Sequence, residues 1–135
     1  MKWGLIYVVR ISRLSRLGHT FVEATVYSGD LSASRKVKLL VDTGSTYTWI
    51  SRKRLAELSI TPLRERGFRT VDHRILKRKI GEAMIDYAGE RVTTVVVFAE
   101  DEDEEVLGVY TLEGLAMEFD PVANELRKVD AILAV

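Results

Sequence analysis

The stretch 39-LLVDTGSTYTWI-50 places one acidic residue, Asp42, in the middle of a strongly apolar segment. A buried carboxylate is costly unless donors satisfy its oxygens, so Asp42 is expected to be hydrogen-bonded or to have a chemical role. Gly44 permits a tight turn and a close backbone approach. Thr43 and Ser45 bring hydroxyl groups that can hold a carboxylate in place. The pattern predicts a strand, a tight loop carrying Asp42, and a second strand.

Two interpretations of this loop are a plain hairpin turn and a phosphate-binding loop. The first is a plain hairpin turn, although such a turn need not be enclosed by apolar residues on both sides. The second is a phosphate-binding loop, since sugar kinases and actin-like ATPases open with a similar apolar-Asp-x-Gly hairpin whose backbone N–H groups hold phosphate. Those folds need two α/β domains, and a chain of 135 residues without a βαβ pattern does not fit them.

A third reading rests on two motifs taken together. Residues 41–45, Val-Asp-Thr-Gly-Ser, resemble the signature of the aspartic proteases, specifically the single-domain retroviral type. The second signature of that family is two apolar residues and a glycine. Val106, Leu107 and Gly108 supply it, 66 positions after Asp42, and a helix is expected over Thr111–Met117. The resemblance implies an all-β, retropepsin-like acid protease barrel with one or two short helices.

The resemblance also implies a flap, the hairpin that covers the substrate in this family. Phe68–Ile80 fits it, with a turn near Asp72–Arg74. Val71, Asp72 and His73 are therefore expected to contact substrate.

Catalysis in this family needs two carboxylates that share one proton. The chain has one Asp-Thr-Gly, so the second carboxylate is expected from Asp42 of another copy in a C2 homodimer. The resemblance assigns Thr43 to bracing the two loops, Gly44 to substrate approach and Ser45 to donating to the outer Asp42 oxygen. The apolar ends, Met1–Tyr7 and Ile132–Val135, could pair as strands between subunits.

Two positions depart from the retroviral pattern. The viral enzymes carry an Asp four residues after the catalytic Asp and an Arg directly after the second-motif Gly, and the two form an ion pair near the dimer interface. Here these positions hold Thr46 and Val109. Both charges are absent together, so no unpaired charge remains, but the viral style of dimer stabilisation is not expected.

The function expected from these motifs is aspartic endopeptidase activity, in which water activated between two Asp42 carboxylates hydrolyses a peptide or protein substrate. The expected pH optimum is acidic, and no cofactor is expected. The alternative is a non-catalytic dimer of the same fold that binds a peptide or another protein. The complete catalytic loop favours the enzyme.

The whole chain, residues 1–135, reads as one domain built from short strands with close turns. A helix is expected at Arg52–Leu58, capped by Ser51. The expected strands are Leu5–Ile11, Thr20–Tyr27, Val37–Val41, Thr46–Ile50, Phe68–His73, Ile75–Ile80, Glu82–Tyr87, Arg91–Phe98, Met117–Phe119 and Glu125–Val129.

Composition narrows the partners and the compartment. The net charge is zero and there is no cysteine, which favours a cytoplasmic location. The start, MKWGLIYVVR, does not read as a signal peptide, and no apolar run approaches the roughly 20 residues of a membrane span. No membrane partner is expected. His19 and His73 are too few and too isolated for a metal site.

One charged segment raises the question of a charged partner. Residues 64–79 carry seven basic and two acidic side chains and could attract acidic peptides or nucleic acid. Nucleic-acid binding is not expected, because Phe68 alone is available for base stacking. An exposed, charged flap accounts for the run. The acidic residues 100–105 are expected to be exposed and could neutralise part of it.

Overall fold

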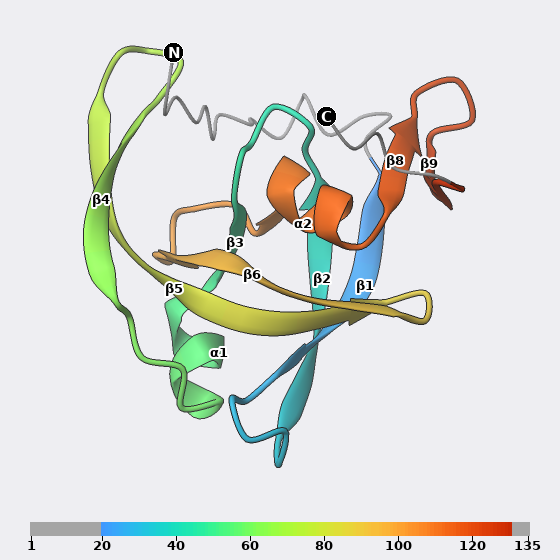
Figure 1. The fold of residues 1–135 in the computed structure, drawn as a ribbon. Helices are drawn as coiled ribbons and strands as arrows, with labels where there is room; N and C mark the ends of the chain where they lie inside the picture. Colours follow the sequence, from blue (N-terminus) through green and yellow to red (C-terminus); the bar gives the residue numbers. More distant parts are fainter. Residues whose placement is uncertain (1–19, 131–135) are drawn as a thin grey trace, which may run out of the picture.

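The computed structural model describes residues 20–130 (Figure 1). Most of this part is β-structure, with two short helices. In chain order the elements are β1 (Phe21–Tyr27), β2 (Ser34–Val41), β3 (Thr48–Ser51), α1 (Arg52–Glu57), β4 (Arg64–Arg69), β5 (Ile75–Tyr87), β6 (Glu90–Ala99), β7 (Val106–Leu107), α2 (Val109–Gly114), β8 (Met117–Asp120) and β9 (Glu125–Lys128).

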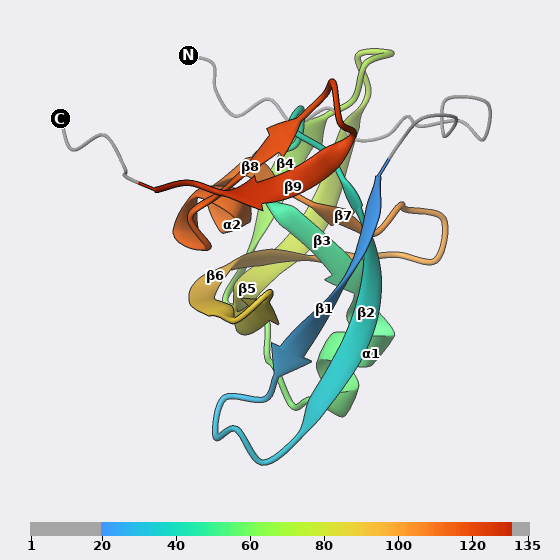
Figure 2. The same cartoon turned by 90° about the vertical axis from the view of Figure 1, so that its right-hand side faces the viewer.

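Seven strands form one mixed sheet in the order β1-β2-β7-β3-β6-β5-β4. An additional pairing of β1 with β5 closes this sheet into a ring, and β4 remains outside it as the partner of β5 alone. The strands β8 and β9 form a separate two-stranded hairpin, visible beside β1 in Figure 2. The structure therefore confirms the expected closed β fold with two short helices.

The central strands are buried on both faces, which explains their uninterrupted apolar sequences. Leu39 and Leu40 are neighbours in β2 but belong to two different core clusters. In β3, Trp49 and Ile50 divide in the same way. The apolar sequence on both sides of Asp42 thus arises because the two strands that flank it lie between two hydrophobic layers.

The strand β5 differs from the sequence prediction. We expected two strands, Ile75–Ile80 and Glu82–Tyr87, and the structure has one continuous strand of 13 residues. Gly81 makes no turn: a Cβ atom there would lie 3.1 Å from the Thr61 carbonyl oxygen and 3.2 Å from the Phe98 ring. The glycine permits close packing at the position where β5 passes from β4 to β6 as its main partner.

The first half of β5 and all of β4 form a hairpin that projects beyond the ring, on the left of Figure 1. It has the position in the chain that we expected for the flap, and β4 begins at Arg64 rather than at Phe68. We call this element, residues 64–79, the flap hairpin.

Both helices begin close to the expected positions. The Ser51 hydroxyl accepts a hydrogen bond from the Lys53 N–H at 3.2 Å and caps α1, as the sequence predicts. Helix α2 begins at Val109 instead of Thr111 and ends at Gly114. Met117 lies outside this helix because it pairs with Lys128 in the β8–β9 hairpin.

Three predictions fall on segments outside the described residues: the strand Leu5–Ile11 and the two intersubunit segments, Met1–Tyr7 and Ile132–Val135. Neither helix in the described part of the chain is long and apolar enough to cross a membrane.

Candidate active site

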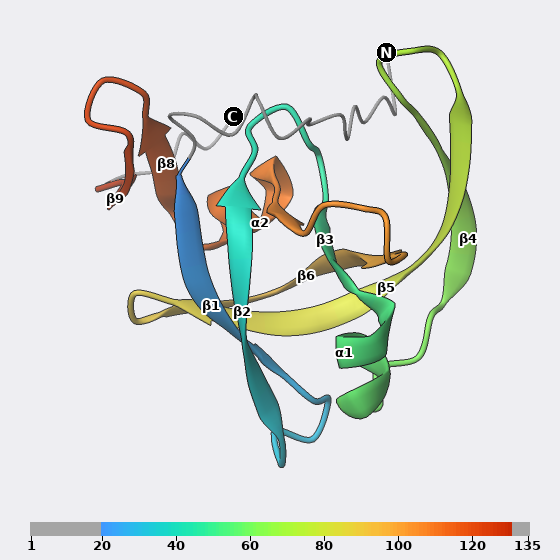
Figure 3. The same ribbon diagram turned by 180° about the vertical axis from the view of Figure 1, so that it is seen from behind.

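Asp42 lies on a tight loop that joins β2 to β3, at the top of Figure 3. The short strand β7 is inserted directly behind this loop. It pairs with β2 in parallel, Val41 opposite Leu107, and with β3 in the antiparallel direction, Trp49 opposite Val106. The Asp42 N–H donates to the Leu107 carbonyl oxygen at 3.0 Å. The structure thus brings together the two motifs that the sequence separates.

Gly108 fits where no other residue could. A Cβ atom at this position would lie 2.3 Å from the Tyr47 carbonyl oxygen and 2.8 Å from that of Ser45. The close approach lets the next two N–H groups bond to the Asp42 loop: Val109 donates to Ser45 at 2.8 Å and Tyr110 to Thr46 at 3.1 Å. The second motif therefore fixes the backbone of the Asp42 loop from behind.

The Asp42 carboxylate is held on one side only. Its Oδ1 accepts a hydrogen bond from the Gly44 N–H at 2.9 Å. Its Oδ2 is buried and has no hydrogen-bond partner among residues 20–130. An unsatisfied buried oxygen costs about 1–3 kcal/mol. A hydrogen bond from a donor on another molecule or chain would remove this cost.

Ser45 does not have the role that we expected. Its side chain is fully buried, and its hydroxyl donates to the Tyr47 carbonyl oxygen at 2.7 Å rather than to Asp42. The Ser45 N–H meanwhile donates to the Asp42 carbonyl oxygen at 3.1 Å. The sequence prediction was wrong because the loop turns tightly enough for the Ser45 hydroxyl to reach the Tyr47 carbonyl oxygen.

Thr43 and Gly44 occupy the exposed tip of the loop. The Thr43 hydroxyl has no hydrogen-bond partner in the described part of the chain, so it is available to a second molecule. Its expected role in bracing two loops across a dimer axis stays a prediction, since the structure contains one copy.

A cluster of buried threonines supports the site, and the sequence analysis missed it. Thr48 and Thr111 form a hydroxyl–hydroxyl contact of 2.6 Å, and Thr94 lies 3.2 Å from Thr111. The Thr48 hydroxyl also accepts the Gly108 N–H at 3.0 Å. No local signal marks these residues, because β3, β6 and α2 bring them together only in the folded chain.

The flap hairpin packs against the segment that follows the Asp42 loop. The buried ring of Phe68 packs edge-on against Tyr47, with 6.2 Å between ring centroids, and lies 5.1 Å from Trp49. Val71, Asp72 and His73 are exposed at the tip of the hairpin, as the flap assignment requires. Substrate contact by these three residues stays a prediction.

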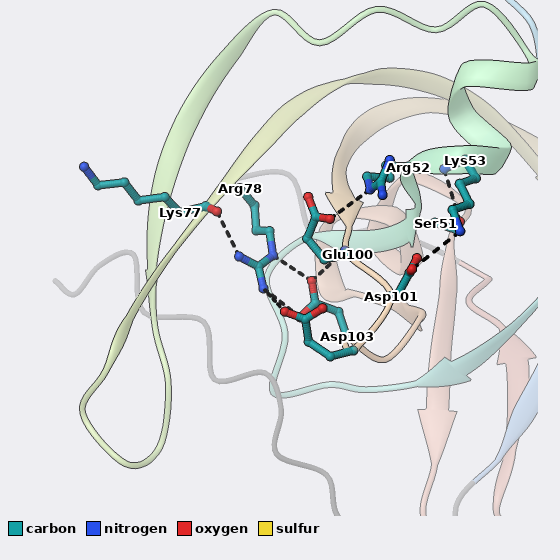
Figure 4. A network of polar contacts seen from close by, with 9 residues as sticks. Ser51, Arg52, Lys53, Lys77, Arg78, Glu100, Asp101 and Asp103 are labelled. Atoms are coloured by element: carbon teal, nitrogen blue, oxygen red, sulfur yellow. Dashed lines mark hydrogen bonds and ion pairs between the residues drawn. The ribbon is translucent and has the colours of Figure 1, made fainter.

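The acidic segment 100–105 is less exposed than we expected. Asp103 is nearly buried, with 8% of its side chain accessible, and it forms a two-bond ion pair with Arg78 of β5, itself 10% accessible (Figure 4). This contact raises the pKa of the Arg78 guanidinium. Asp103 also accepts the Glu100 N–H at 2.8 Å. The folded loop thus uses one of its acids to hold the base of the flap hairpin.

Metal ligands do not gather around Asp42. Within residues 20–130 there is no group of three or more His, Cys, Asp or Glu side chains that could hold a metal ion. The described parts of the site are therefore a carboxylate, a hydroxyl and backbone groups.

A closed mixed β-sheet with an Asp-Thr-Gly loop, an inserted strand behind it and a projecting hairpin is the architecture of a retropepsin-like acid protease. Comparison with protein families agrees: the family described as aspartyl protease matches residues 22–111, a span that includes the Asp42 loop, the flap hairpin and Gly108. The chain belongs to this retropepsin-like aspartyl protease family. A search among curated proteins found no match.

Proposed function

We propose that the chain is an aspartic endopeptidase that acts as a homodimer, with one Asp42 carboxylate from each subunit. The observation that carries the proposal is the buried Asp42 Oδ2, which lacks a partner among residues 20–130 although backbone hydrogen bonds to β7 and α2 fix the loop around it. A second Asp42 sharing one proton would satisfy this oxygen. Family membership supports the same reading, because retropepsin-like proteins typically act on peptides as dimers.

The chemistry follows from two carboxylates held close together. Two like charges at short distance cannot both ionise easily, so one carboxylate stays protonated while the other is ionised. The ionised group takes a proton from water, which attacks the scissile carbonyl carbon, while the protonated group donates its proton to the carbonyl oxygen. Transfer of a proton to the amide nitrogen then breaks the C–N bond.

The cytoplasmic location suggested by the lack of cysteine remains part of the proposal.

Cleavage of a mixed peptide library across acidic and neutral pH tests the enzyme claim, with Asp42→Asn beside the wild type. We expect cleavage by the wild type, fastest at acidic pH, and none by Asp42→Asn. Asp130→Asn, which changes an exposed acid outside the site, serves as the control and is expected to retain activity. Binding of peptides without cleavage by the wild type would indicate a non-catalytic peptide-binding dimer instead.

A further inference from the structure

Among residues 20–130, five basic side chains of the flap hairpin have no acidic partner. Arg74 pairs with Asp72 at the tip, at 3.0 Å, and Arg78 pairs with Asp103 at the base. The remaining basic residues are exposed and form no ion pair with any residue between 20 and 130; they are Arg64, Arg66, Arg69, Lys77 and Lys79. One acid of the hairpin, Glu65, is left to oppose them.

The acidic segment 100–105 does not neutralise these five cations. Apart from the contacts of Arg78, its described ion pairs go to three consecutive residues of α1: Arg52 with Glu100, Lys53 with Asp101, and Arg54 with Glu105. Figure 4 shows the Lys77 side chain extending away from this network, to which the residue contributes only its carbonyl oxygen. Five of the six acids of this loop are therefore engaged with α1 or Arg78.

The segments outside residues 20–130 contain no acidic side chain that could take their place. Residues 1–19 and 131–135 include no Asp or Glu, and residues 1–19 add the basic side chains of Lys2, Arg10, Arg13 and Arg16. The positive charge of the flap hairpin is therefore available to an acidic molecule.

Two of the five cations, Arg64 and Arg66, share a face of β4 with Phe68, and Arg66 is the nearer of the two in sequence. Side chains two apart on a strand point to the same side, so Arg66 lies on the face of the hairpin that carries Phe68. The Phe68 ring packs on Tyr47, close after the Asp42 loop. Arg66 also lies opposite Arg78 across the hairpin, and Asp103 forms its ion pair with Arg78 rather than with Arg66. The exposed Arg66 side chain is therefore on the side of the flap hairpin that faces the segment after the Asp42 loop.

We propose that the flap hairpin selects peptide substrates with acidic side chains beside the scissile bond, and that Arg66 binds one of these carboxylates. The proposal rests on the proposed peptidase function and adds the substrate class. A guanidinium and a carboxylate form two parallel hydrogen bonds, which gives both strength and orientation. The other unpaired cations of the hairpin raise the local concentration of acidic chains around the flap.

A phosphate backbone is the other polyanion that such a surface could attract. Proteins that bind single-stranded nucleic acid combine positive charge with exposed aromatic side chains on which bases stack. The flap hairpin has one aromatic residue, Phe68, and its ring is buried against Tyr47 and Trp49. The structure therefore favours an acidic peptide.

Three peptides that share one apolar cleavage sequence and differ only in flanking Glu, Gln or Lys test the proposal. We expect the Glu peptide to have the highest kcat/KM, mainly through a lower KM, and its advantage to shrink as salt is added. In Arg66→Gln the preference for Glu over Gln should fall roughly fivefold, the factor that corresponds to about 1 kcal/mol. Arg35→Gln, an exposed cation on β2 already paired with Glu57, should keep the wild-type preference.

Equal cleavage of the three peptides, or an unchanged preference in Arg66→Gln, would overturn the proposal. If no peptide is cleaved, the peptidase function fails, and the same peptides, fluorescently labelled, are titrated onto the wild type and Arg66→Gln. Binding that favours Glu in the wild type alone would support recognition of acidic chains, and binding without preference would refute it. Displacement of the Glu peptide by a lower concentration of a single-stranded oligonucleotide would refute it in favour of nucleic acid.

Discussion

Gly108 is the residue at which the backbone of the site tolerates least change. In Gly108→Ala, the new methyl group would have to displace the Tyr47 and Ser45 carbonyl groups, which lie 2.3 and 2.8 Å from its position. Overpacking of this kind costs about 1–3 kcal/mol. We expect a lower midpoint of urea unfolding and a loss of peptidase activity. Gly29→Ala is the matched control, because nothing lies within 4 Å of the added methyl group, and it should change neither measurement.

Thr48 contributes through its hydroxyl rather than its size. Thr48→Val keeps the shape but leaves the Gly108 N–H without the acceptor that now lies 3.0 Å away. An unsatisfied buried N–H costs about 1–3 kcal/mol, so the free energy of unfolding should fall by that amount. Thr93→Val, an exposed substitution on β6, should have little effect. If both variants unfold at the same denaturant concentration as the wild type, the threonine cluster does not support the site.

At the scale of elements, an ion pair attaches the base of the flap hairpin to the rest of the fold. The Arg78–Asp103 pair joins β5 to the loop that leads into β7, close to the position where β5 leaves β6. Asp103→Asn removes one charge of a nearly buried pair, and such a change costs roughly 3 kcal/mol. We expect lower global stability and faster amide hydrogen exchange in residues 64–79 than in β6.

A neighbouring acid provides the control for this prediction. Asp101 pairs with Lys53 at 3.5 Å, and both side chains are mostly exposed. Pairs of this type contribute at most about 1 kcal/mol, so Asp101→Asn should leave exchange in the flap hairpin nearly unchanged. Similar exchange in the two variants would mean that the buried pair does not hold the hairpin.

The sequence predicted these elements well where local signals decide them. The Ser51 cap, the Ala88-Gly89 turn between β5 and β6, and the apolar strands flanking Asp42 are all local, and the structure confirms them. The continuity of β5 through Gly81 depends on Thr61 and Phe98, which are distant in sequence. The direction of the Ser45 hydroxyl depends on loop geometry that residue types alone do not define. These features could not be predicted because they arise from contacts formed only after folding.

For the whole molecule, the proposed shared site makes activity depend on pairing of subunits. When Asp42→Asn is added in excess to a fixed amount of wild type, mixed dimers should form that contain one catalytic carboxylate. We expect activity to fall well below that of the wild type alone, as measured by peptide cleavage after subunit exchange. The variant Arg35→Gln, which keeps Asp42, should not lower the peptidase activity when it is added in the same excess. Unchanged activity in the first mixture, with exchange verified, would contradict a shared site.

Acid stability is a second property of the whole molecule, and Asp30 in the β1–β2 turn contributes to it. Hydrogen bonds from Ser32 and Ser28 lower the pKa of Asp30 from 3.8 to about 2. The folded state therefore holds this proton less tightly than the unfolded chain, so the contribution to stability is complete above pH 3.8 and is lost as the pH falls towards 2. The difference in Tm between the wild type and Asp30→Asn should shrink over this range. A difference that stays constant would show that Asp30 adds no pH-dependent stability.

The insertion of β7 between β2 and β3 also determines when the site can assemble. During synthesis, the Asp42 loop leaves the ribosome long before Val106 and Leu107, the residues that complete the sheet behind it. Contacts between segments so distant in sequence form slowly, because a long loop must close first. A nascent chain that ends within the acidic segment 100–105 lacks the backbone partner of Asp42. The order of synthesis therefore delays formation of the complete Asp42 loop until β7 has been made.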